Sequence, residues 1–93
     1  MSTKVFAAFL PMRDAEKSAA LRPQHLAYLE ALEREGKILA RGPFADGSGG
    51  LVLYLAASLE EAKQLAEGDP YVVHGARGLA LHEWKVTGQL VER

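Results

Sequence analysis

The chain has 93 residues, of which 48% are hydrophobic and none is cysteine, and its formal net charge is -1. This length allows a single domain, residues 1–93, and the lack of cysteine excludes disulfides, a thiol nucleophile and cysteine-bound metals. The near balance of charges is not typical of a nucleic-acid binder, and no apolar run approaches a membrane span. With no secretion signal visible, we expect a soluble cytoplasmic protein without membrane or nucleic-acid partners.

A strand is predicted at residues 4–10, where β-forming apolar residues occupy both faces before Pro11. A long helix follows, with Asp14 as its N-cap and Gly36 as its stop signal. Pro23 means that this helix either starts at the proline or kinks there. One helical face carries Leu21, His25, Tyr28, Leu29 and Leu32.

Two further strands, predicted at residues 37–41 and 51–57, are joined by a glycine-rich stretch at residues 42–50. The Asp-Gly pair within this stretch is sufficient for a tight turn. The additional Gly49 and Gly50 therefore indicate a bulge or a place where something approaches the backbone closely. The alternative is a flexible connection.

The second half of the chain predicts a helix that Ser58 caps, with Glu61 completing a capping box and Gly68 ending the helix. Residues 69–75 predict one helical turn, in which Asp69 is the cap. A fourth strand is predicted at residues 79–86. The tail after it is expected to be frayed or to lie on a partner.

The order β-α-β-β-α-β is that of an α+β, ferredoxin-like fold, with both helices on one face of a four-stranded antiparallel sheet. The strands at residues 4–10 and 51–57 are apolar on both faces, whereas a sheet with one solvated face should alternate apolar and polar residues. Because two helices cannot cover the far face, we expect a second copy to cover it in a homodimer. The alternative is a face of exposed apolar side chains.

An ordered set of short motifs resembles the YciI-like (YCII-related) family from the first predicted strand to the fourth. The motifs are Arg22-Pro23-x-His25-Leu26-x-x-Leu29, Gly36, Gly42-Pro43, Asp46, Gly49-Gly50, Ser58-Leu59-x-x-Ala62 and Asp69-Pro70-Tyr71. The resemblance implies a dimeric α+β barrel and a pocket that holds a histidine and an aspartate together. Some members are similar to cofactor-free dehydrochlorinases and muconolactone-isomerase-like enzymes. His25 matches the family's histidine, and Asp46 is the aspartate we match to it.

His25 is the strongest candidate for a catalytic residue. An imidazole changes its charge near neutral pH and can accept a proton, and a carboxylate beside it would fix its tautomer. The alternative is a core histidine bonded to a backbone carbonyl. Asp46 likewise could be only a turn former or a solvated carboxylate. Its catalytic interpretation requires the glycine-rich stretch to fold back over His25.

If the stretch folds back in this way, its backbone N–H groups could face an oxyanion and Ser48 could add a hydrogen bond. Arg22 and Arg41 could hold a carboxylate, and Asp69 is expected mainly as a helix cap. His74 and His82 match no common metal-ligand spacing, so we expect no metal site. The family resemblance implies that no cofactor is needed. The expected substrate-binding residues are Arg22, Gly42, Pro43, Ser48, Gly49, Gly50, Asp69 and Tyr71.

These observations favour a cofactor-free enzyme in which His25, oriented by Asp46, moves a proton on a small anionic or phenolic molecule. The reaction would be an isomerisation, an elimination or a lyase step. A second hypothesis is a non-catalytic small-molecule-binding or accessory module with the same pocket. A third, an RNA-binding sheet, is disfavoured by the charge balance and by the lack of aromatic RNA-recognition motifs.

Overall fold

The computed structural model describes residues 3–88. The elements are β1 (Lys4–Pro11), α1 (Ala15–Arg34), β2 (Ile38–Pro43), β3 (Gly49–Ala56), α2 (Leu59–Glu67), α3 (Pro70–Val73) and β4 (Ala80–Trp84). This order confirms the predicted βαββαβ arrangement. Most of the tail, for which fraying or a partner contact was expected, lies outside the described residues.

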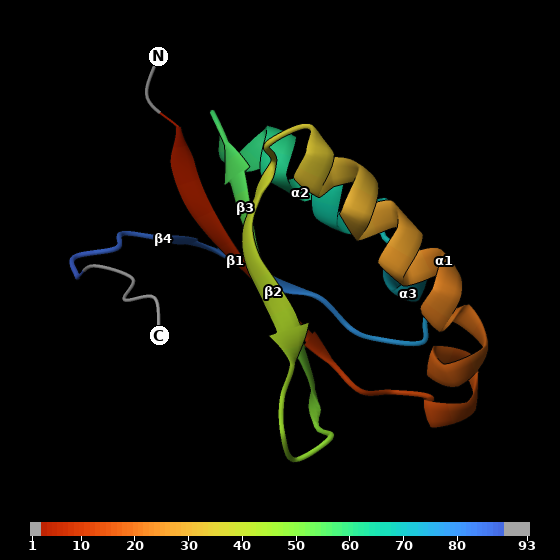
Figure 1. Cartoon of the computed structure of the whole chain (residues 1–93). Coiled ribbons are helices and arrows are strands. Elements are labelled where there is room, and N and C mark those ends of the chain that lie inside the picture. The colour runs from red at the N-terminus through yellow and green to blue at the C-terminus, as the bar shows by residue number, and fades with distance from the viewer. Residues whose placement is uncertain (1–2, 89–93) are drawn as a thin grey trace.

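The four strands form one antiparallel sheet in the order β2-β3-β1-β4, which is the ferredoxin-like topology. Figure 1 shows all three helices on the same side of this sheet, with α3 close to α1. The central strands β1 and β3 pair so that Phe6 lies opposite Tyr54 and Ala8 lies opposite Val52. Because side chains alternate along a strand, these four residues all face the helices.

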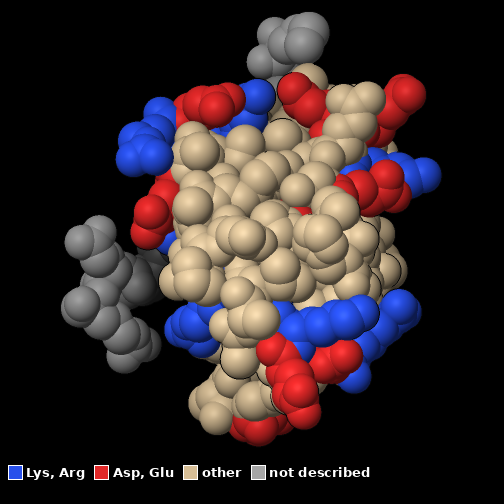
Figure 2. Space-filling model, turned by 90° about the vertical axis from the view of Figure 1, so that its right-hand side faces the viewer, with Lys and Arg blue, Asp and Glu red and all other residues tan. Residues whose placement is uncertain are grey.

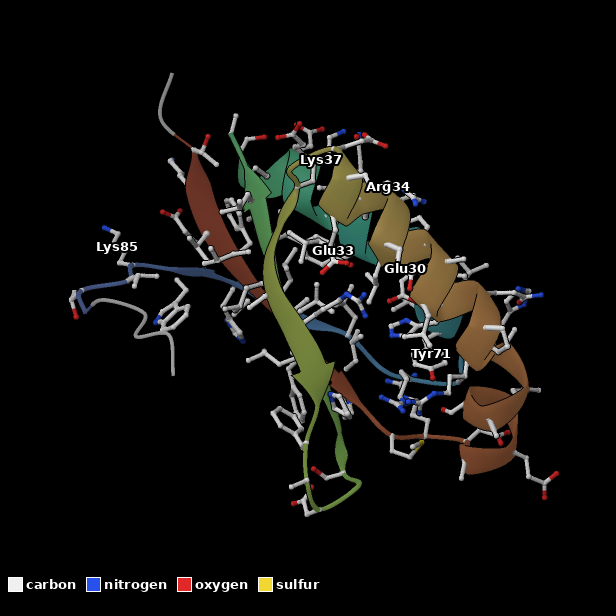
Figure 3. All side chains as sticks on the ribbon, viewed as in Figure 1. Glu30, Glu33, Arg34, Lys37, Tyr71 and Lys85 are labelled. Atoms are coloured by element: carbon white, nitrogen blue, oxygen red, sulfur yellow. The ribbon has the colours of Figure 1, made fainter. Side chains whose placement is uncertain are left out.

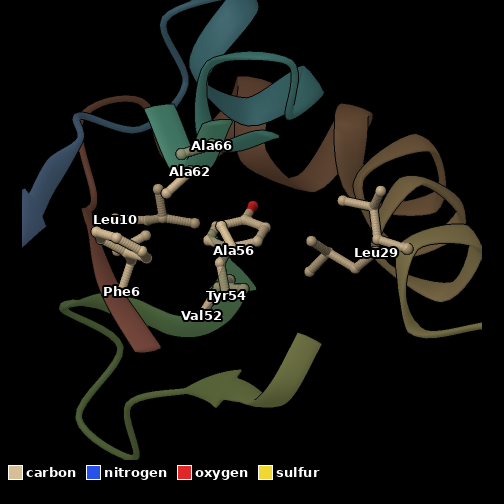
Figure 4. Close-up of a cluster of buried hydrophobic side chains, with 10 residues drawn as sticks. Phe6, Leu10, Leu29, Val52, Tyr54, Ala56, Ala62 and Ala66 are labelled. Atoms are coloured by element: carbon tan, nitrogen blue, oxygen red, sulfur yellow. The ribbon is translucent and has the colours of Figure 1, made fainter. Parts of the chain in front are cut away.

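The hydrophobic core lies between this face of the sheet and the inner faces of α1 and α2. Figure 4 shows Tyr54 at its centre, between Phe6 and Leu29, and all three side chains are fully buried. Burying an aromatic or aliphatic side chain of this size contributes about 1.5–3 kcal/mol each. The core also includes Ala8, Leu10, Leu32, Val52, Ala56, Ala62 and Ala66.

Helix α1 is continuous through Pro23, so the predicted new start at the proline does not occur. Asp14 caps the helix by accepting a 3.0 Å hydrogen bond from the Lys17 backbone N–H, and Gly36 follows it with a φ of 76°. Pro23 is exposed and lacks an N–H, so it removes one helical hydrogen bond. The buried Leu29, on the inner face of α1, packs against the core. Helix propensities measured for isolated residues do not include this stabilising contact.

The glycine-rich stretch forms a hairpin that extends beyond the sheet, well away from α1 (Figure 1). Its turn is closed by hydrogen bonds from Phe44 N–H to the Gly49 carbonyl (2.9 Å) and from Gly47 N–H to the Phe44 carbonyl (3.1 Å). β2 therefore reaches Pro43 and β3 begins at Gly49, two residues beyond each predicted boundary.

No helix of the described residues covers the far face of the sheet. The register places Val5, Ala7, Phe9, Leu51, Leu53 and Leu55 on this face. Phe9 is 38% exposed there, and it contacts the ring of Phe44 at a centroid distance of 5.6 Å. Trp84, opposite Val5 on the edge strand, is 43% exposed. The predicted apolar far face is therefore present.

Charged side chains of both signs are interspersed on the surface shown in Figure 2, around a broad area that carries neither sign. Below this area several Lys and Arg side chains lie next to one another, with Asp and Glu side chains adjoining them. Among residues 3–88 no helix combines the length and the apolar character needed to cross a membrane.

Candidate active site

The site centres on a hydrogen bond between His25 on α1 and Asp69, the residue before α3. His25 Nδ1 lies 2.8 Å from one carboxylate oxygen of Asp69 and 2.9 Å from the other. The Asp69 side chain is completely buried and that of His25 is 12% exposed. A carboxylate accepts hydrogen bonds only, so Nδ1 carries the proton, and in the neutral ring Nε2 has a free lone pair.

Asp69 holds both α3 and the imidazole with one carboxylate. Its Oδ1 accepts a 2.9 Å hydrogen bond from the Tyr71 backbone N–H, which caps α3. The predicted helix cap is therefore confirmed. The Tyr71 ring then stacks on His25, with centroids 3.9 Å apart and planes inclined by 12°. The imidazole is thus fixed both at Nδ1 and across one face.

Arg77, in the loop between α3 and β4, lies against the Tyr71 ring that stacks on His25. Its guanidinium carbon lies 4.5 Å from the centroid of the Tyr71 ring, a cation–π distance. Its Nε donates to the hydroxyl oxygen of the buried Ser18 at 3.1 Å. That hydroxyl lies within reach of the Ala76 carbonyl oxygen (3.4 Å) and of Met12 Sδ (3.2 Å).

His25, Tyr71 and Arg77 border a pocket between α1 and the ends of β2 and β3. It encloses about 450 Å³ when the solvent at its open mouth is included. Figure 3 shows Tyr71 beside α1, on the side of the sheet that the helices cover. The lining consists of Leu10, Arg22, His25, Leu26, Leu29, Arg41, Gly42, Pro43, Gly50, Leu51, Val52, Tyr71 and Arg77.

Arg41 reaches the pocket from β2 and is already paired with Glu33 of α1. Its Nη2 donates to Glu33 Oε1 at 2.9 Å, and this hydrogen bond lowers the pKa of the Glu33 carboxyl below its ordinary value. Figure 3 shows Glu33 projecting from α1 toward β2. Arg41 Nε is buried and has no hydrogen-bond partner among residues 3–88.

The structure pairs His25 with Asp69 and not with Asp46, which corrects the expected pairing. Asp46 lies exposed in the hairpin turn, where its Oδ1 accepts a 2.9 Å hydrogen bond from Ser48 N–H. The Ser48 side chain and then its backbone lower the pKa of the Asp46 carboxyl. The hairpin extends along the sheet axis instead of bending over α1, because its strands continue to pair up to the turn.

The predicted substrate-binding residues divide into two groups. Arg22, Gly42, Pro43, Gly50 and Tyr71 line the pocket. Ser48 and Gly49 do not line it, and Asp69 lies behind the imidazole.

The close approach predicted at Gly49 is made by strand β1. Gly49 has a φ of 153°, and a Cβ there would collide with the Leu10 carbonyl oxygen and lie 3.0 Å from Pro11 Cα. Gly50 is restricted mainly by β2, because its Cβ would lie 3.1 Å from the Gly42 carbonyl oxygen.

Arg77 is the functional candidate that sequence reasoning missed. It follows the predicted helical turn by two residues, at a position with no motif of its own. The only local signal was that a basic residue lies close behind Asp69 and Tyr71. Within residues 3–88 no group of three or more His, Asp or Glu side chains is arranged to hold a metal ion.

Comparison with known proteins gives relatives along most of the chain. Protein YjpA of Bacillus subtilis is 39% identical over 62 residues, covering 67% of this chain and 73% of that protein. Protein YciI of Escherichia coli is 39% identical over 70 residues, covering 64% and 71%.

A solved structure is also similar. It is the 5-chloro-2-hydroxyhydroquinone dehydrochlorinase TftG of Burkholderia phenoliruptrix in complex with 2,5-dihydroxybenzoquinone. It is 26% identical, with a TM-score of 0.74, and the match covers 87% of this chain and 93% of TftG. The protein-family model for the YCII-related domain matches residues 4–85 of this chain. The chain therefore belongs to the YCII-related domain family.

Proposed function

We propose that this protein is a cofactor-independent enzyme in which His25 transfers a proton on a small molecule, in an isomerisation, an elimination or a lyase step. The observation that carries the proposal is the hydrogen bond from His25 Nδ1 to the completely buried Asp69 carboxylate. A surface histidine needs no such partner.

The geometry supports a separate role for each of His25, Asp69 and Tyr71. Asp69 keeps the proton on Nδ1, so that the neutral ring presents Nε2 as a base. When Nε2 takes a proton from the substrate, the ring becomes a cation that the 2.8 Å contact with Asp69 stabilises. The stacked Tyr71 ring limits rotation of the imidazole. A positioned base of this kind contributes about 10²–10⁴-fold to a rate.

The likeness to TftG supports an elimination as the first reaction to test. TftG removes the elements of hydrogen chloride from a chlorinated hydroxyhydroquinone, and its substrate class is small and phenolic. In such a reaction here, Nε2 of His25 would take a proton from the substrate while the chloride leaves with the electron pair of its carbon–chlorine bond. The pocket of this chain is open to solvent and borders His25.

The test is an NMR assay without added cofactor, on a panel of small phenols, quinols and unsaturated lactones, with and without a carboxylate, that includes 5-chloro-2-hydroxyhydroquinone. We expect at least one compound to be isomerised or to lose a leaving group. His25→Gln should slow this turnover at least about 10²-fold. The variant keeps a polar side chain beside Asp69, and its circular dichroism spectrum should match that of the wild type.

Equal rates for the wild type and His25→Gln would overturn the proposal. Ligands that bind and stabilise the protein, but that emerge unchanged from both proteins, would instead support the non-catalytic binding or accessory module. The pocket residues are the same in both cases, and only the fate of the ligand differs.

A further inference from the structure

Three arginines, Arg22, Arg41 and Arg77, line the pocket, and no Asp or Glu of residues 3–88 is among its lining residues. Among residues 3–88 only Arg41 has a carboxylate within 4.0 Å, that of Glu33. Asp69 lies behind His25, completely buried. A concave surface lined by one sign of charge concentrates its field and favours a ligand of the opposite sign.

Arg77 is held in place by two contacts that come from other elements of the fold. Its Nε is bonded to Ser18, and its guanidinium lies over the Tyr71 ring. These contacts leave its two terminal nitrogens without a hydrogen-bond partner among residues 3–88. A side chain held in one rotamer loses less entropy when it binds a ligand, so Arg77 is pre-organised.

The wall near this guanidinium is bare backbone. A Cβ built on Gly50 would lie 3.7 Å from Arg77 Nη1, so the absence of a side chain leaves the space beside the guanidinium open. The remainder of the lining is mainly apolar, and Leu26, Leu29 and Val52 contribute to it. The pocket therefore combines a fixed cation with a surface suited to a hydrocarbon body.

We propose that Arg77 is the anion-anchoring residue of this pocket and that it selects a small molecule with an apolar body and a carboxylate. The carboxylate pairs with the terminal nitrogens of Arg77, with Arg22 available as a second cation. The ring or chain of the ligand lies against the leucines, which brings it alongside His25. This inference rests on the site of the proposed function and names its substrate class.

The test compares benzoate with benzamide, which is nearly the same shape but neutral, by NMR titration of the wild-type protein at neutral pH. We expect benzoate to shift the Tyr71 and His25 ring signals at millimolar concentration and to bind about tenfold more tightly than benzamide. Arg77→Gln should weaken benzoate binding about tenfold and leave benzamide binding unchanged.

Arg34→Gln is the matched control, because it also removes one positive charge but lies at the C-terminal end of α1, away from Tyr71. Figure 3 shows Arg34 far along the helix from Tyr71, and it does not line the pocket. It should bind benzoate as the wild type does. Where Arg77→Gln fails to fold, Arg77→Lys keeps the charge over Tyr71, loses the fork of two nitrogens and should still weaken benzoate binding severalfold.

Three results would overturn the inference: no benzoate binding at millimolar concentration, equal affinity for benzoate and benzamide, or equal weakening by Arg77→Gln and Arg34→Gln. The outcome is separate from that of the proposed function. Benzoate binding and turnover are measured separately, so a failed anchor leaves proton transfer open, and a protein without turnover can still show the anchor.

Discussion

Asp69 shows how one side chain can be both a structural cap and a candidate catalytic partner. Its Oδ1 accepts from Tyr71 N–H and from His25 Nδ1, while Oδ2 lies 2.9 Å from the same ring nitrogen. Oδ1 therefore serves both the cap and the imidazole, and Oδ2 adds a second contact to the imidazole. Asp46 also bonds the backbone two residues ahead of it, but it is exposed and is not among the residues that line the pocket.

Asp69→Asn should reverse the tautomer of His25. The amide oxygen can keep the cap to Tyr71 N–H, and the NH₂ group then faces Nδ1 and donates to it, so the ring proton moves to Nε2. We expect turnover to fall by about 10²–10⁴-fold with little change in fold. The ¹⁵N chemical shifts of the two ring nitrogens measure the tautomer directly. Asp46→Asn is the matched control, and an equal effect of both variants would refute the assignment to Asp69.

At the scale of elements, the hairpin between β2 and β3 shows why glycine stands at the start of β3. The backbone of β1 passes so close to Gly49 that its Cβ position is occupied by the Leu10 carbonyl, whereas nothing lies within 4 Å of a Cβ at Gly42. Gly49 is therefore required for the pairing of β1 with β3. It is this pairing that places Gly50 and Val52 at the wall of the pocket.

Gly49→Ala should destabilise the protein by about 2–5 kcal/mol, because it combines an unfavourable φ with a collision against backbone. For a domain of this size, this corresponds to a melting temperature at least about 10 °C lower. Thermal denaturation followed by circular dichroism measures the change. Gly42→Ala has open space and should shift the midpoint only slightly. Equal stability of the two variants would show that β1 can move away from β3 at little cost.

At the scale of the whole molecule, the sheet has one face packed against helices and one face without cover among the described residues. The uncovered face is made of apolar side chains from both central strands, among them the exposed Phe9, together with the exposed Trp84 of the edge strand β4. An apolar face of this kind is most stable against a second, complementary surface. A two-fold axis brings the same face of two copies into contact, so we propose a homodimer with the two sheets face to face.

Light scattering should therefore give a mass about twice the 10.1 kDa of one chain. Phe9→Glu should shift the protein toward monomer, because it buries a charge at the interface. Val73→Glu, which changes an apolar residue that is 61% exposed on α3, should leave the dimer intact. A monomeric wild type at micromolar concentration, or dissociation by both variants alike, would contradict this assembly.

The sequence by itself determined the elements, their order and the apolar far face. These depend on local signals: alternating or continuous apolar runs, the caps Asp14 and Ser58, and the stop at Gly36. It also identified His25, because the helical period places this residue on the buried face of α1. The helix boundary at Pro23 was left open, since propensity does not include the packing that holds α1 in one piece.

Only the tertiary structure decided which aspartate meets His25 and showed that Arg77 faces the pocket. Asp46 and Asp69 are both turn or cap residues by local pattern, and nothing local separates them. Residues 25 and 69 meet because α1 and α3 pack side by side on one face of the sheet. Arg77 lies in a loop without a motif, and its direction is fixed by Ser18 and Tyr71, which come from two other elements. Contacts between residues so distant along the chain depend on how the elements pack, and local sequence patterns carry no information about that packing.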